Sequence, residues 1–174
     1  ASAALHHLRN LVPFQWASVV LFDFEAQGAT RLALEANGGT TLEAGARFPL
    51  TAFGDIGLLR RGQIQIVEDV ASLAQPSPLV EALKAEGLRS YIQLPLLAAG
   101  ELVGALNLGA SRLQTFSPEH RDIAREVADQ LAIAIQQARL SGQVQRHAAE
   151  LEQKVEERTQ DLQAVNEQLA AASR

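Results

Sequence analysis

The sequence predicts an α+β fold, with an antiparallel sheet flanked by helices and a long C-terminal helix that continues as a coiled coil. Three observations support this fold class. Apolar runs with a period of two are separated by turn residues, as in antiparallel strands. Short helical patterns bounded by proline and glycine lie between those runs. From Pro118 to the end of the chain, the only strong helix breaker is Gly142.

The strands are predicted from apolar residues that alternate with polar ones. In the second strand, this alternation puts Leu32 and Leu34 on the face opposite to Arg31, and a tight turn is expected at 37–39. Pro95 lies inside a later strand and cannot donate a ladder hydrogen bond, which indicates an edge position or a bulge. The predicted strands are 16–25, 31–39, 46–50, 63–70 and the two halves of 90–111, which form a hairpin around residues 99–101.

The helices are predicted from periodicity and from their end residues. Phe53, Ile56 and Leu59 recur every three residues before a glycine, which favours a short helix. In the last helix, Ser117 is the expected N-cap and Pro118 takes the first helical position. The predicted helices are an N-terminal one, 53–62, 76–87 and the long helix that begins within 116–140.

Composition excludes several classes of function. The net charge of −5, with no run of lysine and arginine, argues against a nucleic-acid partner. No apolar run approaches the roughly 18 residues that a membrane span needs, and no signal peptide is evident, so we expect a cytoplasmic protein. The absence of methionine suggests an internal piece of a longer protein. The absence of cysteine excludes thiolate nucleophiles, zinc–thiolate sites and cofactors attached through sulfur.

Four stretches in this order and spacing resemble the GAF domain, a small-molecule-sensing module of signalling proteins. They are WASVVLFDFE (16–25), GDIGLLRRGQIQIVEDV (54–70), SYIQLPLLAAGELVGALNLGAS (90–111) and TFSPEHRDIAREVADQLAIAIQQARL (115–140). The resemblance covers roughly residues 1–140, which we take as the sensory domain, and it implies no enzymatic activity of its own. We also find no catalytic motif, phosphate loop or metal-binding motif in the chain.

The sequence departs from the ligand-binding patterns of this family in ways that narrow the choice of ligand. Members that hold a tetrapyrrole covalently use cysteine, so that cofactor is excluded here. Members that bind cyclic nucleotides carry an Asn-Lys pair, a Phe and an Asp-Glu pair. In this chain Phe116 remains, but Ser111 and Arg112 replace the first pair, and His120 and Arg121 replace the second. The cyclic-nucleotide motif is therefore missing.

Haem is not expected as a cofactor, because a haem-binding member needs an axial histidine that faces the pocket. His6 and His7 lie on the predicted first helix, whereas His120 and His147 lie on the last one. His147 also lacks the acidic residue and the Arg-Thr-Pro that normally follow the phosphorylated histidine of sensor kinases. It is interpreted as an ordinary coiled-coil position.

A candidate ligand site follows from strand parity, because side chains two residues apart share a sheet face. Ile92, Leu94 and Leu96 make one face apolar, and that face is expected to pack on the terminal helices. The other face mixes aromatic and polar side chains, as a small-molecule site requires. The candidate residues are Trp16, Ser18, Phe22, Phe53, Asp55, Tyr91, Gln93 and Asn107. For the polar residues the alternative is a structural hydrogen bond under a loop, and for Asp55 it is a helix cap.

Residues 141–174 are interpreted as a coiled-coil linker that continues the last domain helix and pairs two chains in a parallel homodimer. Its sequence resembles the linker that precedes a PAS, kinase or diguanylate cyclase domain in bacterial sensors. The predicted seam is Val127, Leu131, Ala134, Ala138, Ala148, Leu151, Val155, Arg158, Leu162, Val165 and Leu169. The two halves of this seam differ in register, with the change near residues 141–143, and Arg158 weakens the second half.

These observations predict a sensory and dimerisation domain of a bacterial signalling protein, of the sensor histidine kinase type. It would bind an unidentified small molecule and pass a conformational change to an output domain outside this chain. The alternative is a ligand-free dimerisation module. A polar-tipped pocket volume would favour the sensor, and apolar packing without a cavity would favour the alternative.

Overall fold

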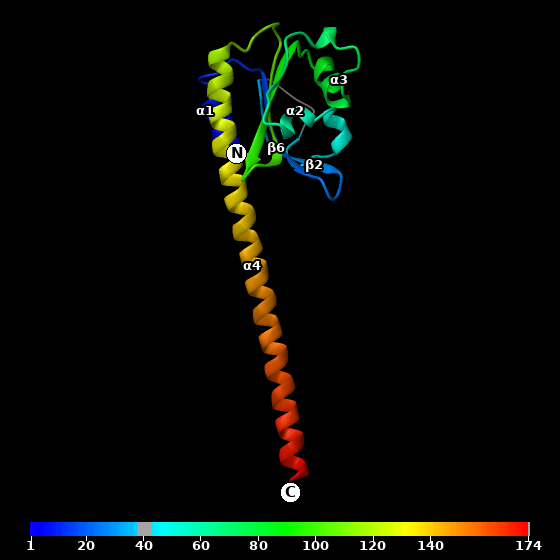
Figure 1. Cartoon of the computed structure of the whole chain (residues 1–174), viewed down its shortest axis with the longest axis vertical. Helices are drawn as coiled ribbons and strands as arrows, with labels where there is room; N and C mark the ends of the chain where they lie inside the picture. Colours follow the sequence, from blue (N-terminus) through cyan, green and yellow to red (C-terminus); the bar gives the residue numbers. More distant parts are fainter. Residues whose placement is uncertain (38–42, 174) are drawn as a thin grey trace. The chain divides into compact units, whose positions relative to one another are not determined.

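The computed structural model describes residues 1–37 and 43–173, which contain a six-stranded antiparallel sheet, its helices and one long C-terminal helix (Figure 1). The strand order is β3-β2-β1-β6-β5-β4. The strands are β1 Trp16–Asp23, β2 Gly28–Ala36, β3 Arg47–Pro49, β4 Gln65–Val67, β5 Ser90–Ala98 and β6 Glu101–Ala110. The α-helices are α1 Ser2–Leu8, α2 Gly57–Arg60, α3 Pro78–Ala85 and α4 Pro118–Ala172, and η1 Leu50–Phe53 and η2 Val70–Ser72 are 3₁₀ turns. The predicted fold class is confirmed.

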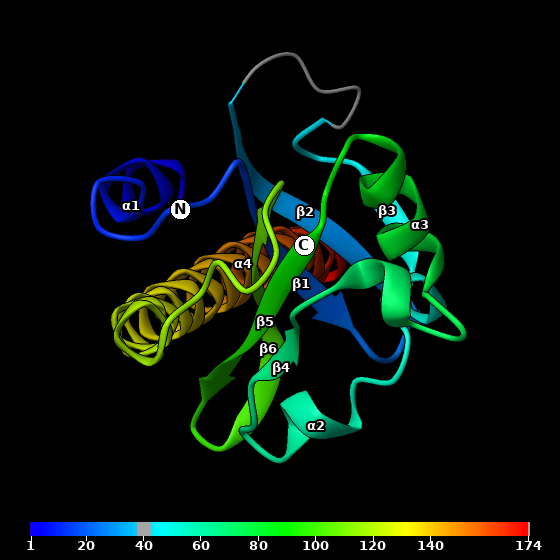
Figure 2. The ribbon, with the colours of Figure 1, turned by 90° about the horizontal axis from the view of Figure 1, so that it is seen from above.

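The chain divides into two compact units, residues 1–134 and 135–174, and α4 begins in the first and continues through the second. In the first unit, α1 and the start of α4 lie on one side of the sheet, and α2 and α3 lie on the other (Figure 2). On the α4 side, Ile92, Leu94 and Leu96 are fully buried. Ala124 and Ala128 of α4 are buried as well, because such small side chains allow a helix to approach a sheet closely.

Local signals place two features where the sequence predicted them. The hairpin between β5 and β6 turns at Ala99 and Gly100, which both have positive φ, 51° and 82°. Helix α4 begins at Pro118, and the Ser117 hydroxyl accepts a hydrogen bond from the His120 N–H at 3.3 Å. Pro95 lies beyond the residues of β5 that pair with β4, as expected for an edge position.

Strand β2 does not keep the predicted alternation. A bulge opposite Val19 and Val20 inserts Leu32 as an extra residue, since Val19 pairs with Ala33 but Val20 pairs with Arg31. Leu32 is therefore 44% exposed, whereas Arg31 is 1% exposed. The prediction of a regular alternation, with Leu32 on the apolar face of the strand and Arg31 on the other, was therefore wrong. Part of the turn expected at 37–39 lies outside the described residues.

The segment between β3 and β4 also differs from the prediction. The single helix expected at 53–62 is a 3₁₀ turn that ends at Phe53, followed by the four-residue helix α2. The strand expected at 63–70 is reduced to β4, in which Ile66 is 39% exposed and Val67 is buried. Short elements of this kind are set by what they cover, so periodicity alone places them poorly.

Candidate functional site

A small cavity lies on the mixed face of the sheet, beneath α3. It brings together five of the predicted site residues, which come from β1, η1, β5 and β6. The lining residues are Trp16, Phe53, Ser77, Leu79, Val80, Leu83, Tyr91, Gln93 and Asn107. The residues around α3 were missed by the sequence analysis, because a helix pattern does not show which face of the sheet the helix will cover.

Strand register explains why the polar side chains converge. Ser18 pairs with Asn107, and Asn107 pairs in turn with Gln93, so these residues form a row across β1, β6 and β5. Gln65 of β4 extends the row, since it pairs with Gln93. In the next row of the same face, Gly109 lies between Trp16 and Tyr91, where a side chain would collide with Leu88. The floor of the cavity is therefore a polar row bordered by two aromatic rings.

The hydrogen bonding of this floor is incomplete. The Asn107 Nδ2 donates to the Ser18 hydroxyl at 3.3 Å, and both residues are buried. The Trp16 ring is 4% exposed, and its Nε1–H has no acceptor among the described residues. The Gln65 Oε1 is likewise buried without a donor there. A buried polar atom without a partner costs about 1–3 kcal/mol, so such atoms are rare and mark strain or a missing partner.

The cavity is small and carries no charge. Its volume is about 10 Å³, roughly the space for one water molecule. All nine lining residues are uncharged at neutral pH, since eight have no ionisable side chain and burial raises the pKa of the Tyr91 hydroxyl above its usual 10.0. The arrangement can offer neutral hydrogen-bond donors and acceptors and aromatic surface, but no general acid or base poised near pH 7.

The other predicted site residues lie around this cavity rather than in its wall. Ser18 is fully buried below Asn107, and Phe22 packs edge-to-face on Phe53, with ring centroids 5.4 Å apart. The Asp55 carboxylate accepts a hydrogen bond from the Gly57 N–H at 2.8 Å. The N-cap of α2 is Ile56, so Asp55 lies one residue before the cap position that was its alternative interpretation.

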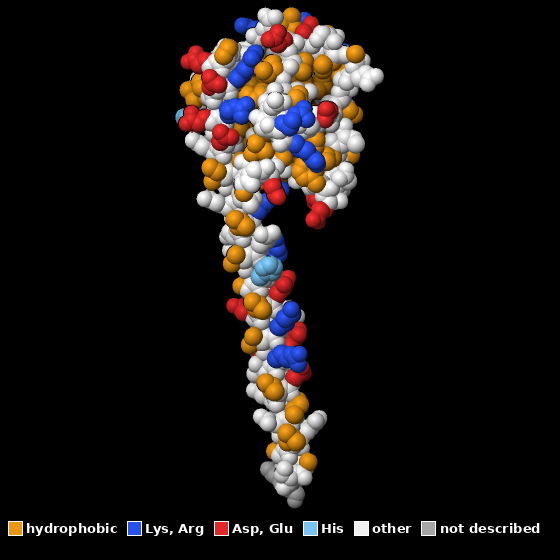
Figure 3. Space-filling view, viewed as in Figure 1, with side chains coloured by type: hydrophobic (Ala, Val, Ile, Leu, Met, Phe, Trp, Pro, Cys, Tyr) orange, Lys and Arg blue, Asp and Glu red, His pale blue; other side chains and the backbone are white. Residues whose placement is uncertain are grey.

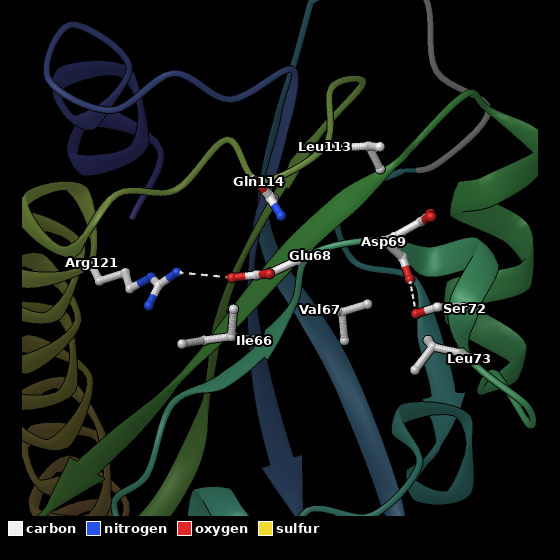
Figure 4. Close-up of a pocket in the computed structure, with 9 residues that line it drawn as sticks. All are labelled: Ile66, Val67, Glu68, Asp69, Ser72, Leu73, Leu113, Gln114 and Arg121. Carbon is white, nitrogen blue, oxygen red and sulfur yellow. Dashed lines mark hydrogen bonds and ion pairs between the residues drawn. The ribbon is translucent and has the colours of Figure 1, made fainter.

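A larger hollow of about 650 Å³ lies at the β4 edge of the sheet and is open to solvent (Figure 4). Its walls come from β4 and the segment after it, from the loop before α4 and from the first turn of α4, and no sequence pattern predicted that these segments would meet. Arg121 lies 3.8 Å from the Glu68 carboxylate, and its Nε donates to the Phe116 carbonyl. The Ser72 hydroxyl donates to the Asp69 carbonyl. Arg121, the arginine of this hollow, is thus already engaged within the chain.

None of the histidines lines the cavity under α3. His6 is exposed and lies 3.5 Å from Glu35, and the His120 ring accepts from the Ser117 N–H. In the described part of the chain, no cluster of three or more histidine, aspartate or glutamate side chains has the arrangement of a metal site. None of the described helices is long and apolar enough to cross a membrane.

The predicted seam residues fall into two groups. In the first unit Leu131 is 6% exposed and belongs to the domain core, while Val127 is half-buried and Ala134 is exposed. In the second unit every seam residue is exposed, and apolar side chains recur along that part of α4 (Figure 3). The large apolar ones are Leu151, Val155, Leu162, Val165 and Leu169, which are 51–67% exposed. Val144, 68% exposed, lies seven residues before Leu151 and was missed.

Comparison with known proteins identifies the family to which this fold belongs. The sequence model of the GAF domain family matches residues 1–136. The chain therefore belongs to the GAF domain family, as its sequence indicated.

Its relatives include circadian input-output histidine kinases. The chain is 40% identical over 76 residues to CikA of Synechococcus elongatus and 29% identical over 118 residues to CikA of Thermosynechococcus vestitus. These matches cover 43% and 67% of this chain but 10% and 16% of those proteins. The chain thus spans a small part of the curated relatives that it matches.

Solved structures share the fold at low sequence identity. The GAF domain of a two-component sensor histidine kinase from Bacillus halodurans aligns with a TM-score of 0.69 at 20% identity, over 80% of this chain and 93% of that one. The blue-light absorbing form of the PixJ GAF domain from Thermosynechococcus elongatus aligns with a TM-score of 0.67 at 17% identity, over 82% and 86%. The PixJ domain absorbs light, whereas the present chain contains no cysteine through which a chromophore could be attached.

Proposed function

We propose that this chain is the sensory domain and signalling linker of a cytoplasmic bacterial signal-transduction protein. It has no enzymatic activity of its own, binds a small molecule in the cavity under α3, and acts on an output domain such as a histidine kinase. Its membership of the GAF family and its histidine kinase relatives support this proposal. The observation that carries it is that one continuous helix, α4, is buried in the domain at Ala124 and Ala128 and then exposes an apolar stripe.

The occupant of the apolar stripe is a second copy of the chain, in parallel orientation. From Val144 to Leu169 the seam alternates in steps of four and three residues, which is the repeat of a two-stranded coiled coil. In parallel pairing, each seam residue meets its own counterpart, so Leu162 packs on Leu162. The same repeat places His147 of one helix beside Glu152 of the other.

The sheet provides the connection between the cavity and α4. Gln93 and Asn107 face the cavity, while their neighbours Ile92 and Leu106 face the other side, where α4 covers the sheet. A ligand that moves β5 and β6 would therefore change the packing under α4. Interfaces of this kind have discrete arrangements, which converts a small shift into a switch.

The tail contains a feature suited to two packings. The steps from Leu140 to Val144 and from Val144 to Ala148 are both four residues, which interrupts the alternation of threes and fours. Such a discontinuity locally changes the winding of a coiled coil. The helix is nevertheless continuous through Gly142. We place the switch between alternative registers at residues 141–143.

A specific observation favours a second candidate, the ligand-free dimerisation module. The cavity in this structure has a volume of about 10 Å³, roughly the space for one water molecule. If the cavity is only core, the tail alone carries the function. Both candidates require the dimer, and only the first requires a ligand.

The dimer is tested by Leu162→Glu in the complete chain, with Gln163→Glu as the matched control that adds the same charge outside the seam. Leu162 contributes about 1.5–3 kcal/mol from each chain. Its loss should weaken dimerisation on the order of 10²–10⁴-fold. Light scattering on size-exclusion chromatography should give a dimer for the wild type and the control, and a monomer for Leu162→Glu. A monomeric wild type, or a Leu162→Glu dimer as stable as the control, would contradict the proposal.

A further inference from the structure

The chemistry of the cavity under α3 restricts what it can bind. This inference rests on the proposed sensory function and concerns the class of ligand. The lining offers hydroxyl, amide and indole groups, and the side chains of α3 that face it are apolar. An ion transferred into such a site without a counter-charge costs several kcal/mol. A charged ligand would therefore bind weakly.

The buried cation of this domain, which could otherwise supply a counter-charge, is already engaged. Arg31 is 1% exposed, and its guanidinium stacks on the Phe48 ring at 4.7 Å and donates to the Glu43 carbonyl at 3.1 Å. Burial lowers its pKa, and the charge of Glu86 opposes that change. Arg31 does not line the cavity. Its hydrogen bond to Glu43 fixes the residues just before β3, so its guanidinium is not placed to neutralise an anionic ligand.

The cavity contains a donor that lacks a partner. The Trp16 Nε1–H can only donate, it is buried, and the described residues supply no acceptor for it. Asn107 already gives one of its protons to Ser18. The aromatic rings of Trp16, Phe53 and Tyr91 line the same cavity and favour a flat ligand.

We propose that the cavity takes a small, planar, uncharged molecule whose hydrogen-bond acceptor meets the Trp16 indole N–H. The amides of Gln93 and Asn107 and the Tyr91 hydroxyl complete its recognition. Entry requires α3 to move away from the sheet, because the cavity has a volume of only about 10 Å³ in this arrangement, too little for such a molecule. The movement of α3 is then the first step of the response.

Benzamide, benzoate and benzamidinium test this class of ligand, because they share one shape and carry charges of zero, minus one and plus one at neutral pH. Trp16 is the only tryptophan, so ¹⁵N-labelled complete chain gives a single indole N–H resonance. Benzamide should shift that resonance downfield in a saturable manner, and at least about tenfold more tightly than either ion, a difference of 1.4 kcal/mol. Gln93→Glu, which places a carboxylate in the wall, should reverse the preference in favour of benzamidinium.

The outcomes separate this inference from the function on which it rests. If benzoate or benzamidinium shifts the wild-type resonance as tightly as benzamide, the cavity binds ligands but the uncharged class is wrong. If none of the three compounds shifts it at millimolar concentration, both the class and the ligand-binding part of the proposed function are overturned. The ligand-free module then stands.

Discussion

The close approach of β1 and β6 at Gly104 supports the cavity floor, and Gly104→Ala should disrupt it. Gly104 pairs with Leu21, and a Cβ at Gly104 would overlap the Val20 carbonyl oxygen and lie 3.2 Å from the Leu21 Cα. Backbone atoms of a central strand cannot turn away as a side chain can. The two strands would have to separate by roughly 1 Å to restore an ordinary contact between carbon and oxygen.

The magnitude follows from two costs. Overpacking of this kind costs about 1–3 kcal/mol, and weakening the two ladder hydrogen bonds beside Gly104 adds about 0.5–1.5 kcal/mol each. The sum, about 2–6 kcal/mol, is a large fraction of the 5–15 kcal/mol by which domains are typically stable. The same separation would lengthen the Asn107–Ser18 hydrogen bond three residues farther along β6.

Gly109→Ala is the matched control, because Gly109 is also a buried residue of β6. There an added Cβ would meet the side chain of Leu88, which can change rotamer at a cost of about 0.5–1.5 kcal/mol. Urea unfolding followed by Trp16 fluorescence, in the Leu162→Glu background to remove coupling to dimerisation, measures both variants. Gly104→Ala should be the less stable by at least about 1 kcal/mol. Equal stability, or a less stable Gly109→Ala, would refute the reasoning.

Three further predictions concern single side chains. Burial raises the pKa of Tyr91, so the folded state holds this proton more tightly than the unfolded state. The stability it contributes is present below about pH 10 and is lost as pH rises through the folded pKa. Denaturation across that range should show this loss in the wild type but not in Tyr91→Phe. Arg158→Leu removes a charge from the seam and should stabilise the dimer by about 1.5–3 kcal/mol per chain, measured by sedimentation equilibrium, and in the full-length protein it should lock the output. Arg31→Lys cannot stack and donate as guanidinium does, and should lower the free energy of unfolding by about 1–3 kcal/mol.

Features set by local chemistry were predictable from the sequence. The turn at Ala99 and Gly100 and the helix start at Ser117 depend on residues within a few positions of one another, so composition and spacing identify them. Parity also placed Trp16, Tyr91, Gln93 and Asn107 on one sheet face. The structure adds that register aligns them across three strands.

Features set by distant partners were not predictable in this way. The bulge at Leu32 exists because Val20 pairs with Arg31, and no residue pattern within β2 predicts it. The burial of Leu131 depends on the sheet under α4, so a stripe read from helix periodicity alone could not separate domain core from exposed seam. The cavity wall at Leu83 depends on which part of the sheet α3 packs against. Each of these facts needs the tertiary arrangement.

The central claim is that the chain acts as a paired sensor with a small molecule under α3. Native mass spectrometry of the protein purified from its own host tests it most directly. The account predicts a dimer that retains one small uncharged molecule per chain, and it predicts that Gln93→Glu keeps the dimer and loses that mass. A dimer with no retained mass would support the ligand-free module instead, and a bare monomer would contradict both.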